Sequence, residues 1–255
     1  MAAALLLALG TAQAQTYPAR SVQMLLGFSA GASVDLMARA VADEMSTILG
    51  QRFLVVNREG ASGVVAMQAV AAAAPDGYLL GVGPATPITN VPHVQPRLPY
   101  KTDSFEYVCQ TFRNDFTVAV RADSPYRTLD ELLAAARKEP GKLSYGHAGH
   151  ASIPHLAAVD LLQKAGVTAL DVPYKGDAAM NQGPNGIFAP KGTPQEILRR
   201  LESACEKAVK SEKVAELAKR YHSAPDYLGS AAFARVVAED YRRKGELIKT
   251  LPLRR

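Results

Sequence analysis

The sequence predicts an α/β protein built from two lobes, and three observations carry this prediction. Between residues 22 and 82, short apolar runs alternate with helical patterns in the order strand, helix, strand, helix, strand, which is typical of a parallel sheet. Residues 84–99 then hold five prolines with little periodicity and are predicted to form a long loop. After this loop the strand, turn and helix unit recurs over residues 143–173, which indicates a second α/β region.

The first region contains three predicted strands joined by two predicted helices. The strands are Val22–Phe28, Phe53–Val56 and Tyr78–Val82. One helix is Val34–Leu49, whose apolar residues recur at helical spacing until the stop signal Gly50, and the other is an Ala-rich run that ends at Ala74. The turns before these helices, at residues 29–33 and 60–63, consist of small residues.

The remaining elements follow from the same signals. Further predicted strands are Tyr107–Thr111, Thr117–Arg121, Leu143–Tyr145 and Ala169–Pro173. Further predicted helices have their first or capping residue at Thr128, Ser152, Thr193, Ser211 and Ser230, and the chain from Lys191 onward is predicted to be helical. Thr128 with Glu131 forms one capping box, and Thr193 with Glu196 forms another, with Pro194 at the first helical position.

Composition and charge exclude several classes of protein. The chain has 255 residues, of which 48% are hydrophobic and 21% charged, and these values exclude global disorder. The net charge is +5, and the basic surplus is spread along predicted helix faces after Lys191. Because it accompanies neither a nucleic-acid-binding motif nor an aromatic platform, we expect no nucleic acid among the partners.

The N-terminal residues have most features of a secretory signal peptide. Ala2–Leu9 is an apolar run too short to span a bilayer, and Ala12-Gln13-Ala14 supplies a small-x-small cleavage signal. No Lys or Arg precedes the run, and a buried N-terminal helix is the alternative interpretation. With cleavage after Ala14, residues 1–14 are the signal peptide and the mature chain is exported.

The sequence contains two cysteines, so one disulfide is possible. Export makes such a bond chemically permissible, so Cys109 and Cys205 are a candidate pair. Nothing in the spacing shows that they lie close together. Cys205 shares an apolar helix face with Leu198 and Leu201, where a cysteine is commonly a plain core residue.

Motifs of the common enzyme classes are absent from the sequence: it has no G-x-S-x-G, P-loop, H-E-x-x-H or C-x-x-C pattern. His147, His150 and His155 form a histidine cluster, and three imidazoles can bind zinc. Their spacings of three and five match no common ligand pattern. We therefore interpret them as capping or hydrogen-bonding residues and expect no metal and no cofactor. A small hydrolase or metal enzyme that uses His147 and His150 is the alternative.

Two similar turns, at residues 28–33 and 145–152, each join a predicted strand to a helix start. Small residues allow a ligand to approach the backbone, and the free N–H groups of a first helical turn donate to anions with help from the helix dipole. Such turns lie outside the carboxyl ends of strands, where open α/β sheets bind ligands. Two such turns on two lobes could close on one small carboxylate. The alternative interpretation is that both turns are ordinary βα connections without a ligand.

The motifs together resemble the substrate-binding receptors of tripartite tricarboxylate transporters, the Bug family. The matching segments are Gly27 to Asp35 with Ala38-Arg39, Val55 to Arg58 with Gly60 to Gly63, Pro75 to Tyr78, Gly146 to Ser152 with His155-Leu156, Val172 to Gly176, and Phe188 to Pro194. They occur in order and extend from about Tyr17 to the C-terminus.

This resemblance implies a two-lobed periplasmic binding protein of type II, the Venus-flytrap architecture, and no catalysis. It implies a small carboxylate as ligand (a di- or tricarboxylate, an acidic amino acid or an aromatic acid) and the membrane subunits of the transporter as partners. The ligand-binding residues carried over are Phe28, Ser29, Ala30, Gly31, Ala32, Ser33, Gly83, Pro84, Thr86, His147, Ala148, Gly149, His150 and Ser152. Asp35 matches the acid of the motif, and because a carboxylate would repel an anion, we expect it to orient loop amides or water.

The chain departs from the family pattern after Gln182. Several tens of residues expected between Gln182 and Gly183-Pro184 are absent, so the resemblance implies a truncated second lobe. The predicted division is residues 15–109 and 185–255 for lobe one and residues 110–184 for lobe two. We expect ligand closure to be impaired and lobe two to be partly ordered or completed by self-association, and an inactive remnant is a further alternative.

Overall fold

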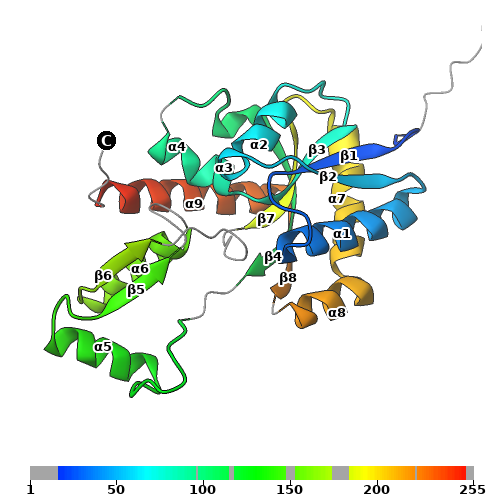
Figure 1. Ribbon diagram of the computed structural model, residues 1–255. Coiled ribbons are helices and arrows are strands. Elements are labelled where there is room, and N and C mark those ends of the chain that lie inside the picture. The colour runs from blue at the N-terminus through cyan, green and yellow to red at the C-terminus, as the bar shows by residue number, and fades with distance from the viewer. Residues whose placement is uncertain are drawn as a thin grey trace, which may run out of the picture.

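The computed structural model describes residues 17–95, 97–114, 118–147, 153–173, 184–221 and 223–250. Its main feature is a six-stranded sheet in the order β2-β1-β3-β7-β4-β8 (Figure 1). The strands are β1 (Val22–Leu26), β2 (Phe53–Asn57), β3 (Leu79–Pro84), β4 (Phe105–Asn114), β7 (Asn185–Pro190) and β8 (Ser223–Gly229). The first three are parallel, as predicted, whereas β7 is antiparallel to β3 and β4, and β8 is antiparallel to β4.

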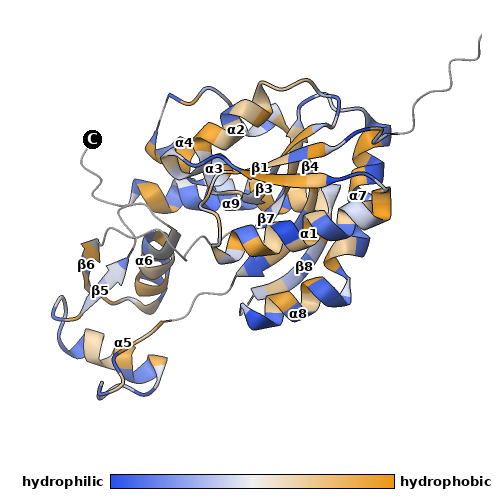
Figure 2. Cartoon of the chain, turned by 45° about the vertical axis from the view of Figure 1, so that its right-hand side comes forward, coloured by the Kyte–Doolittle hydropathy of each residue, from blue (hydrophilic) through white to orange (hydrophobic). Residues whose placement is uncertain are grey.

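Helices cover both faces of this sheet and bury two apolar cores. One face carries α1 (Ser33–Leu49), α7 (Gln195–Val209) and α8 (Glu212–Arg220). The other carries α2 (Val64–Ala71), α3 (Thr86–Thr89), α4 (Val91–Val94) and α9 (Ser230–Lys249). Two short 3-10 helices, η1 (Ala61–Gly63) and η2 (Thr102–Ser104), complete this part. Figure 2 shows apolar and hydrophilic stripes on α7 and α8, which is the pattern of helices packed on one side only.

Within the described ranges, no helix combines the length and apolar character needed to cross a membrane.

The second region forms a smaller unit apart from the main sheet (Figure 1). It contains the parallel strands β5 (Ser144–His147) and β6 (Leu170–Pro173) with the helices α5 (Leu129–Lys138) and α6 (Ile153–Ala165). Parallel sheets are ordinarily larger and covered on both faces. The described part of this sheet has two strands, and Leu170 on β6 is 59% exposed.

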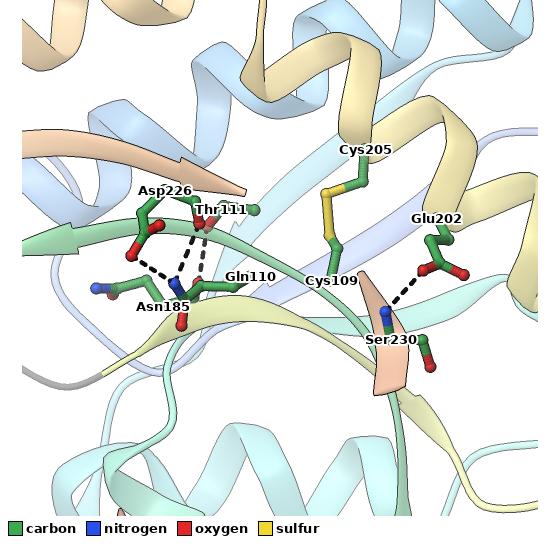
Figure 3. The surroundings of a disulfide bond; sticks show 8 residues. All are labelled: Cys109, Gln110, Thr111, Asn185, Glu202, Cys205, Asp226 and Ser230. Atoms are coloured by element: carbon green, nitrogen blue, oxygen red, sulfur yellow. Dashed lines mark hydrogen bonds between the residues drawn. A yellow bond between two sulfur atoms is a disulfide. The ribbon is translucent and has the colours of Figure 1, made fainter. Parts of the chain in front are cut away.

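A disulfide joins Cys109 on β4 to Cys205 on α7, so the candidate pair is confirmed (Figure 3). Both residues are fully buried in the core between the sheet and α7. The next residues of β4 are held as well: Gln110 Nε2 donates to Asp226 Oδ2 at 2.8 Å, and Thr111 Oγ1 donates to the Asn185 carbonyl at 3.1 Å. The strand that leads toward the second unit is therefore fixed to α7, β7 and β8.

The predicted long loop over residues 84–99 is wrong, because it contains α3 and α4. Pro87 and Pro92 lie in the first turns of these two helices. A proline is tolerated there because the first amides of a helix have no intrahelical acceptor. The prolines thus mark helix starts in this segment rather than irregular backbone.

The predicted strand Thr117–Arg121 is also wrong for its described residues. Residues 118–121 have no strand conformation, and Val118 and Val120 are 53% and 48% exposed. A segment with apolar alternation forms a strand only when a partner strand is present to pair with it. The described residues supply no such partner here.

Two features of the C-terminal part differ from their predictions. The chain is not helical throughout after Lys191, because β8 pairs with β4 at the sheet edge. Its sequence, SAPDYLG, contains Pro and Gly. An edge strand tolerates these residues, but they interrupt the alternating pattern by which a strand is predicted. The capping box at Thr193 is absent: α7 begins after Pro194, and Thr193 Oγ1 donates to the Pro190 carbonyl instead. The box at Thr128 with Glu131 is confirmed at the start of α5.

Candidate functional site

The carboxyl ends of β1, β2 and β3 lie at one edge of the main sheet. These strands are parallel, and the register pairs Leu26 with Asn57 and Leu25 with Gly81. A short connection that contains glycine or alanine follows each strand before the next helix: residues 27–32 after β1, residues 58–60 after β2 and residue 85 after β3. In open α/β sheets this edge is where ligands bind.

The three turns pack against one another. A Cβ atom added at Gly27 would lie 2.5 Å from Gly63 Cα, so the backbones after β1 and before α2 are in direct contact. A Cβ atom at Gly63 would in turn lie 3.3 Å from Pro87 Cγ and 3.5 Å from Phe28 Cε2. Segments that are far apart in sequence thus converge on one spot, and glycine is required at position 27 for this approach.

The turn before α2 was not among the predicted ligand-binding residues. Its backbone has positive φ at four successive residues: 134° at Gly60, 46° at Ala61, 55° at Ser62 and 89° at Gly63. Non-glycine residues adopt this conformation rarely, and such strain gathers at functional sites. The sequence signal for this turn is the pair of glycines around two small residues, a pattern similar to the turn before α1.

Helices α1 and α2 start without a capping side chain. The residue before α1 is Ala32 and the residue before α2 is Gly63, and neither makes a side-chain cap. The first amides of α1, on Ser33 and Val34, have no intrahelical acceptor. They are available to an anion at the positive end of the helix dipole.

Asp35 is buried and fully engaged by donors. Its Oδ2 accepts from the Gly31 amide at 2.9 Å and from Arg39 Nε at 3.0 Å, and its Oδ1 accepts from Asn57 Nδ2 at 2.8 Å. Burial opposes ionisation, but these hydrogen bonds outweigh it, so the pKa of Asp35 lies below its ordinary value. Asn57 Nδ2 also donates to the Phe28 carbonyl at 2.9 Å. Asp35 therefore orients the loop backbone, as predicted.

Replacing Asp35 with Asn tests this network. The amide would place a donor opposite existing donors, and we expect Asp35→Asn to lower the free energy of unfolding at pH 7 by about 2 kcal/mol. The Arg39 side chain is 42% exposed, so the loss stays below that of a fully buried pair.

The pH dependence of unfolding supplies the control for this variant. Because the pKa of Asp35 is lowered in the folded chain, its stabilisation is present above about pH 4, the unfolded value, and is lost as the pH falls through the folded pKa. Urea unfolding at pH 7 and pH 3 should therefore show a smaller difference for the variant than for the native chain. Equal differences would contradict the role of Asp35.

The turn after β3 places a buried hydroxyl beside these helix starts. Gly83 has φ of 121°, and a Cβ atom there would lie 2.6 Å from Leu26 Cδ1. Pro84 ends β3, and Thr86 begins α3 with 5% of its surface exposed. Among the residues that the structure describes, Thr86 Oγ1 has no hydrogen-bond partner. A buried polar atom of this kind indicates that a ligand or water supplies the partner.

The predicted residues of the first lobe are thus brought to one edge. Phe28, Ser29, Ala30, Gly31, Ala32 and Ser33 form the turn after β1, with Ser29, Ala30 and Gly31 exposed. Gly83 and Pro84 end β3 and Thr86 begins α3, at the carboxyl end of a strand that lies next to β1 in the sheet.

In the second lobe, His147 ends β5 and is buried. Ala148, Gly149, His150 and Ser152 lie outside the described residues. The structure places His155, on α6, against His147, with ring centroids 4.3 Å apart. It also brings Asp171 to this pair, a residue that sequence spacing did not indicate.

Comparison with protein families gives a match to the tripartite tricarboxylate transporter family receptor over residues 37–184 and 179–253. A UPF0065 protein of Cupriavidus necator is 29% identical, with 95% of this chain and 90% of that protein aligned. A UPF0065 protein of Bordetella pertussis is 35% identical over 69% of this chain and 54% of its own length, so the chain spans about half of that relative.

Solved structures share the fold. A solute-binding protein from Polaromonas has a TM-score of 0.78 at 24% identity and covers 92% of this chain and all of its own. A Rhodopseudomonas palustris protein solved with adipate has a TM-score of 0.76 at 22% identity, covering 92% of this chain and 98% of its own.

The alignment with the Cupriavidus necator protein is longer than this chain. It extends over 297 positions, whereas 95% of 255 residues is about 242, which leaves about 55 positions without a residue in this chain.

Proposed function

Because the chain belongs to the tripartite tricarboxylate transporter receptor family, we propose that it binds a small carboxylate at the carboxyl edge of β1, β2 and β3. The observation that carries this proposal is the convergence of three strand-to-helix turns on helix starts without a side-chain cap, with the Thr86 hydroxyl buried beside them. Backbone amides and one hydroxyl can bind carboxylate oxygens without a cationic side chain.

The charge balance of the site supports an anionic ligand. The carboxylate nearest the turn after β1, Asp35, has its oxygens occupied by Gly31, Arg39 and Asn57. Its negative charge is compensated by Arg39 within 3.0 Å. The exposed turn at Ser29 and Ala30 therefore presents its backbone to an incoming ligand, while the Gly31 amide donates to Asp35 and holds the turn in place.

We propose that the receptor acts in the periplasm after removal of residues 1–14, and that it delivers its ligand to the membrane subunits of the transporter. In this proposal lobe one contains residues 15–109 and 185–255 and lobe two lies within residues 110–184, and lobe two begins only after Asn114 because β4 pairs in the main sheet up to that residue. The family match is split into two parts that meet at residues 179–184, which supports placing the missing positions there. A shortened lobe two would contribute fewer contacts to the ligand and weaken closure.

A thermal-shift panel tests the proposed function. The oxidised mature chain is heated with malate, adipate, citrate, aspartate and benzoate, and with the dimethyl ester of adipate as uncharged control. A carboxylate at a hundred times its Kd should stabilise the folded chain by about 2.7 kcal/mol, which raises the Tm by roughly 5–10 °C. No shift with any of these acids, from a chain that unfolds cooperatively, would contradict carboxylate binding.

A matched pair of threonine variants locates the site. Thr86→Val removes a hydroxyl that has no described partner, so the free chain should keep its stability, whereas affinity for the stabilising carboxylate should fall about tenfold. Thr47→Val is the control, because Thr47 lies on an exposed part of α1. Equal affinities of the two variants would exclude Thr86 from the site.

A further inference from the structure

Two buried histidines and one aspartate meet in the second lobe. His147 and His155 are 3% and 4% exposed, and their rings stack with centroids 4.3 Å apart at an angle of 15°. His147 Nε2 lies 3.5 Å from Asp171 Oδ2. One ligating atom from each of the three residues lies within 4.8 Å of the other two.

The local fold explains why these side chains share one place. Tyr145 and His147 are two residues apart on β5 and therefore point to the same face of the sheet. The register pairs Tyr145 with Asp171 on the neighbouring β6, which puts Asp171 on that face as well. His155 comes from the first turn of α6, which lies beside this small sheet (Figure 1).

We propose that His147, His155 and Asp171 bind a divalent transition metal ion of the zinc class. Two imidazole nitrogens and a carboxylate oxygen suit Zn²⁺, Co²⁺ or Ni²⁺ better than Mg²⁺ or Ca²⁺, which require more oxygen ligands. Three protein ligands leave a fourth position of a tetrahedral ion for water or another small molecule.

The distances are close to those that such an ion needs. Bonds of about 2.0–2.2 Å in a tetrahedral site place neighbouring ligand atoms roughly 3.4 Å apart. The separation between His147 Nε2 and Asp171 Oδ2 is 3.5 Å, close to this value, and the third ligand atom, which lies within 4.8 Å of the others, has to move by up to about 1.4 Å. Because an imidazole nitrogen binds a metal in the plane of its ring, metal binding also requires one of the two stacked rings to turn. The Asp171 side chain is 38% exposed, which gives an ion access from solvent.

This inference does not depend on carboxylate binding and is tested without a carboxylate. The full mature chain, prepared without a polyhistidine tag and treated with a chelator, is titrated with Co²⁺ and followed by visible absorption. A tetrahedral Co²⁺ spectrum with one ion bound per chain, displaced by Zn²⁺, is the expected result. A chain that keeps its circular dichroism but gives no such spectrum would overturn the proposal.

Variants separate the metal site from a merely structural histidine stack. Asp171→Asn is a nearly isosteric change at a partly exposed position, so the fold should persist. The affinity for Co²⁺ should fall by about a hundredfold. Losing only a hydrogen-bond partner of a metal ligand already lowers metal affinity by about 10–100-fold, and Asp171 is itself proposed as a ligand. His155→Ala should lower the affinity for Co²⁺ by about the same factor.

The controls are Asp160→Asn, on α6 with a side chain that is 31% exposed, and His93→Ala, in the first lobe, and both should bind Co²⁺ as the native chain does. Equal affinity of Asp171→Asn and Asp160→Asn would show that Co²⁺ binds elsewhere and would overturn the assignment.

Discussion

Removing the disulfide between Cys109 and Cys205 is expected to lower the free energy of unfolding by about 4 kcal/mol. The bond joins residues 96 positions apart, and the segment that it closes includes the whole second lobe. Closing so long a loop restricts the unfolded chain strongly, which is the main source of stabilisation in the chain-entropy account. Urea unfolding of Cys109→Ala/Cys205→Ala against the oxidised native chain measures this difference.

The native chain unfolded under reducing conditions is the matched control, because it keeps both sulfur atoms in the core. It should lose nearly as much stability as the double variant, and the double variant should not respond to the reductant. Equal urea midpoints for oxidised and reduced native chain would show that the bond does not stabilise the fold.

Gly27→Ala is expected to reduce carboxylate affinity by at least about tenfold and stability by about 1–3 kcal/mol. The new methyl group would lie 2.5 Å from Gly63 Cα, and backbone cannot yield as a flexible side chain can. The turn after β1 must therefore move away from the turn before α2, which separates the amides proposed to share one ligand. Calorimetry with the carboxylate that gives the largest thermal shift measures the affinity.

Gly141→Ala controls for the general effect of a glycine substitution. Gly141 has φ of 76° and no atom within 4 Å of an added Cβ, so the variant carries backbone strain of about 1 kcal/mol but no collision. Its affinity should match that of the native chain. If Gly27→Ala bound the carboxylate as well as Gly141→Ala, the contact between the two turns would have no part in binding.

Much of the local structure was predictable because its signals are local. The helix Ser33–Leu49 follows from apolar spacing and Gly50, and the start of α5 follows from Thr128 and Glu131. Strand β8 was missed because Pro225 and Gly229 weaken its pattern, and it exists only because β4 offers an edge to pair with. The same logic explains residues 118–121, which have the pattern of a strand and no described partner.

The candidate site likewise has a part that the sequence predicts and a part that depends on tertiary contacts. The turn at residues 28–33 could be proposed from the sequence, since small residues at a strand-to-helix junction are a local feature, and its acid Asp35 could be proposed from the family resemblance. The turn at residues 60–63 could not be assigned to the site, because its contact with Gly27 crosses more than 30 residues of chain. Similarly, the spacing of His147, His150 and His155 argued against a metal site, and only the register of β6 adds Asp171 to His147 and His155.

The sequence by itself thus determined the α/β class, the order of most elements and the family. Each of these depends on periodicity, caps or motifs that lie within a few residues of one another, or on their order along the chain. Only the tertiary structure decided that Cys109 meets Cys205, that three turns converge on one edge, and that Asp171 joins two histidines. Such contacts depend on how distant segments pack, and a short stretch of sequence does not specify that packing.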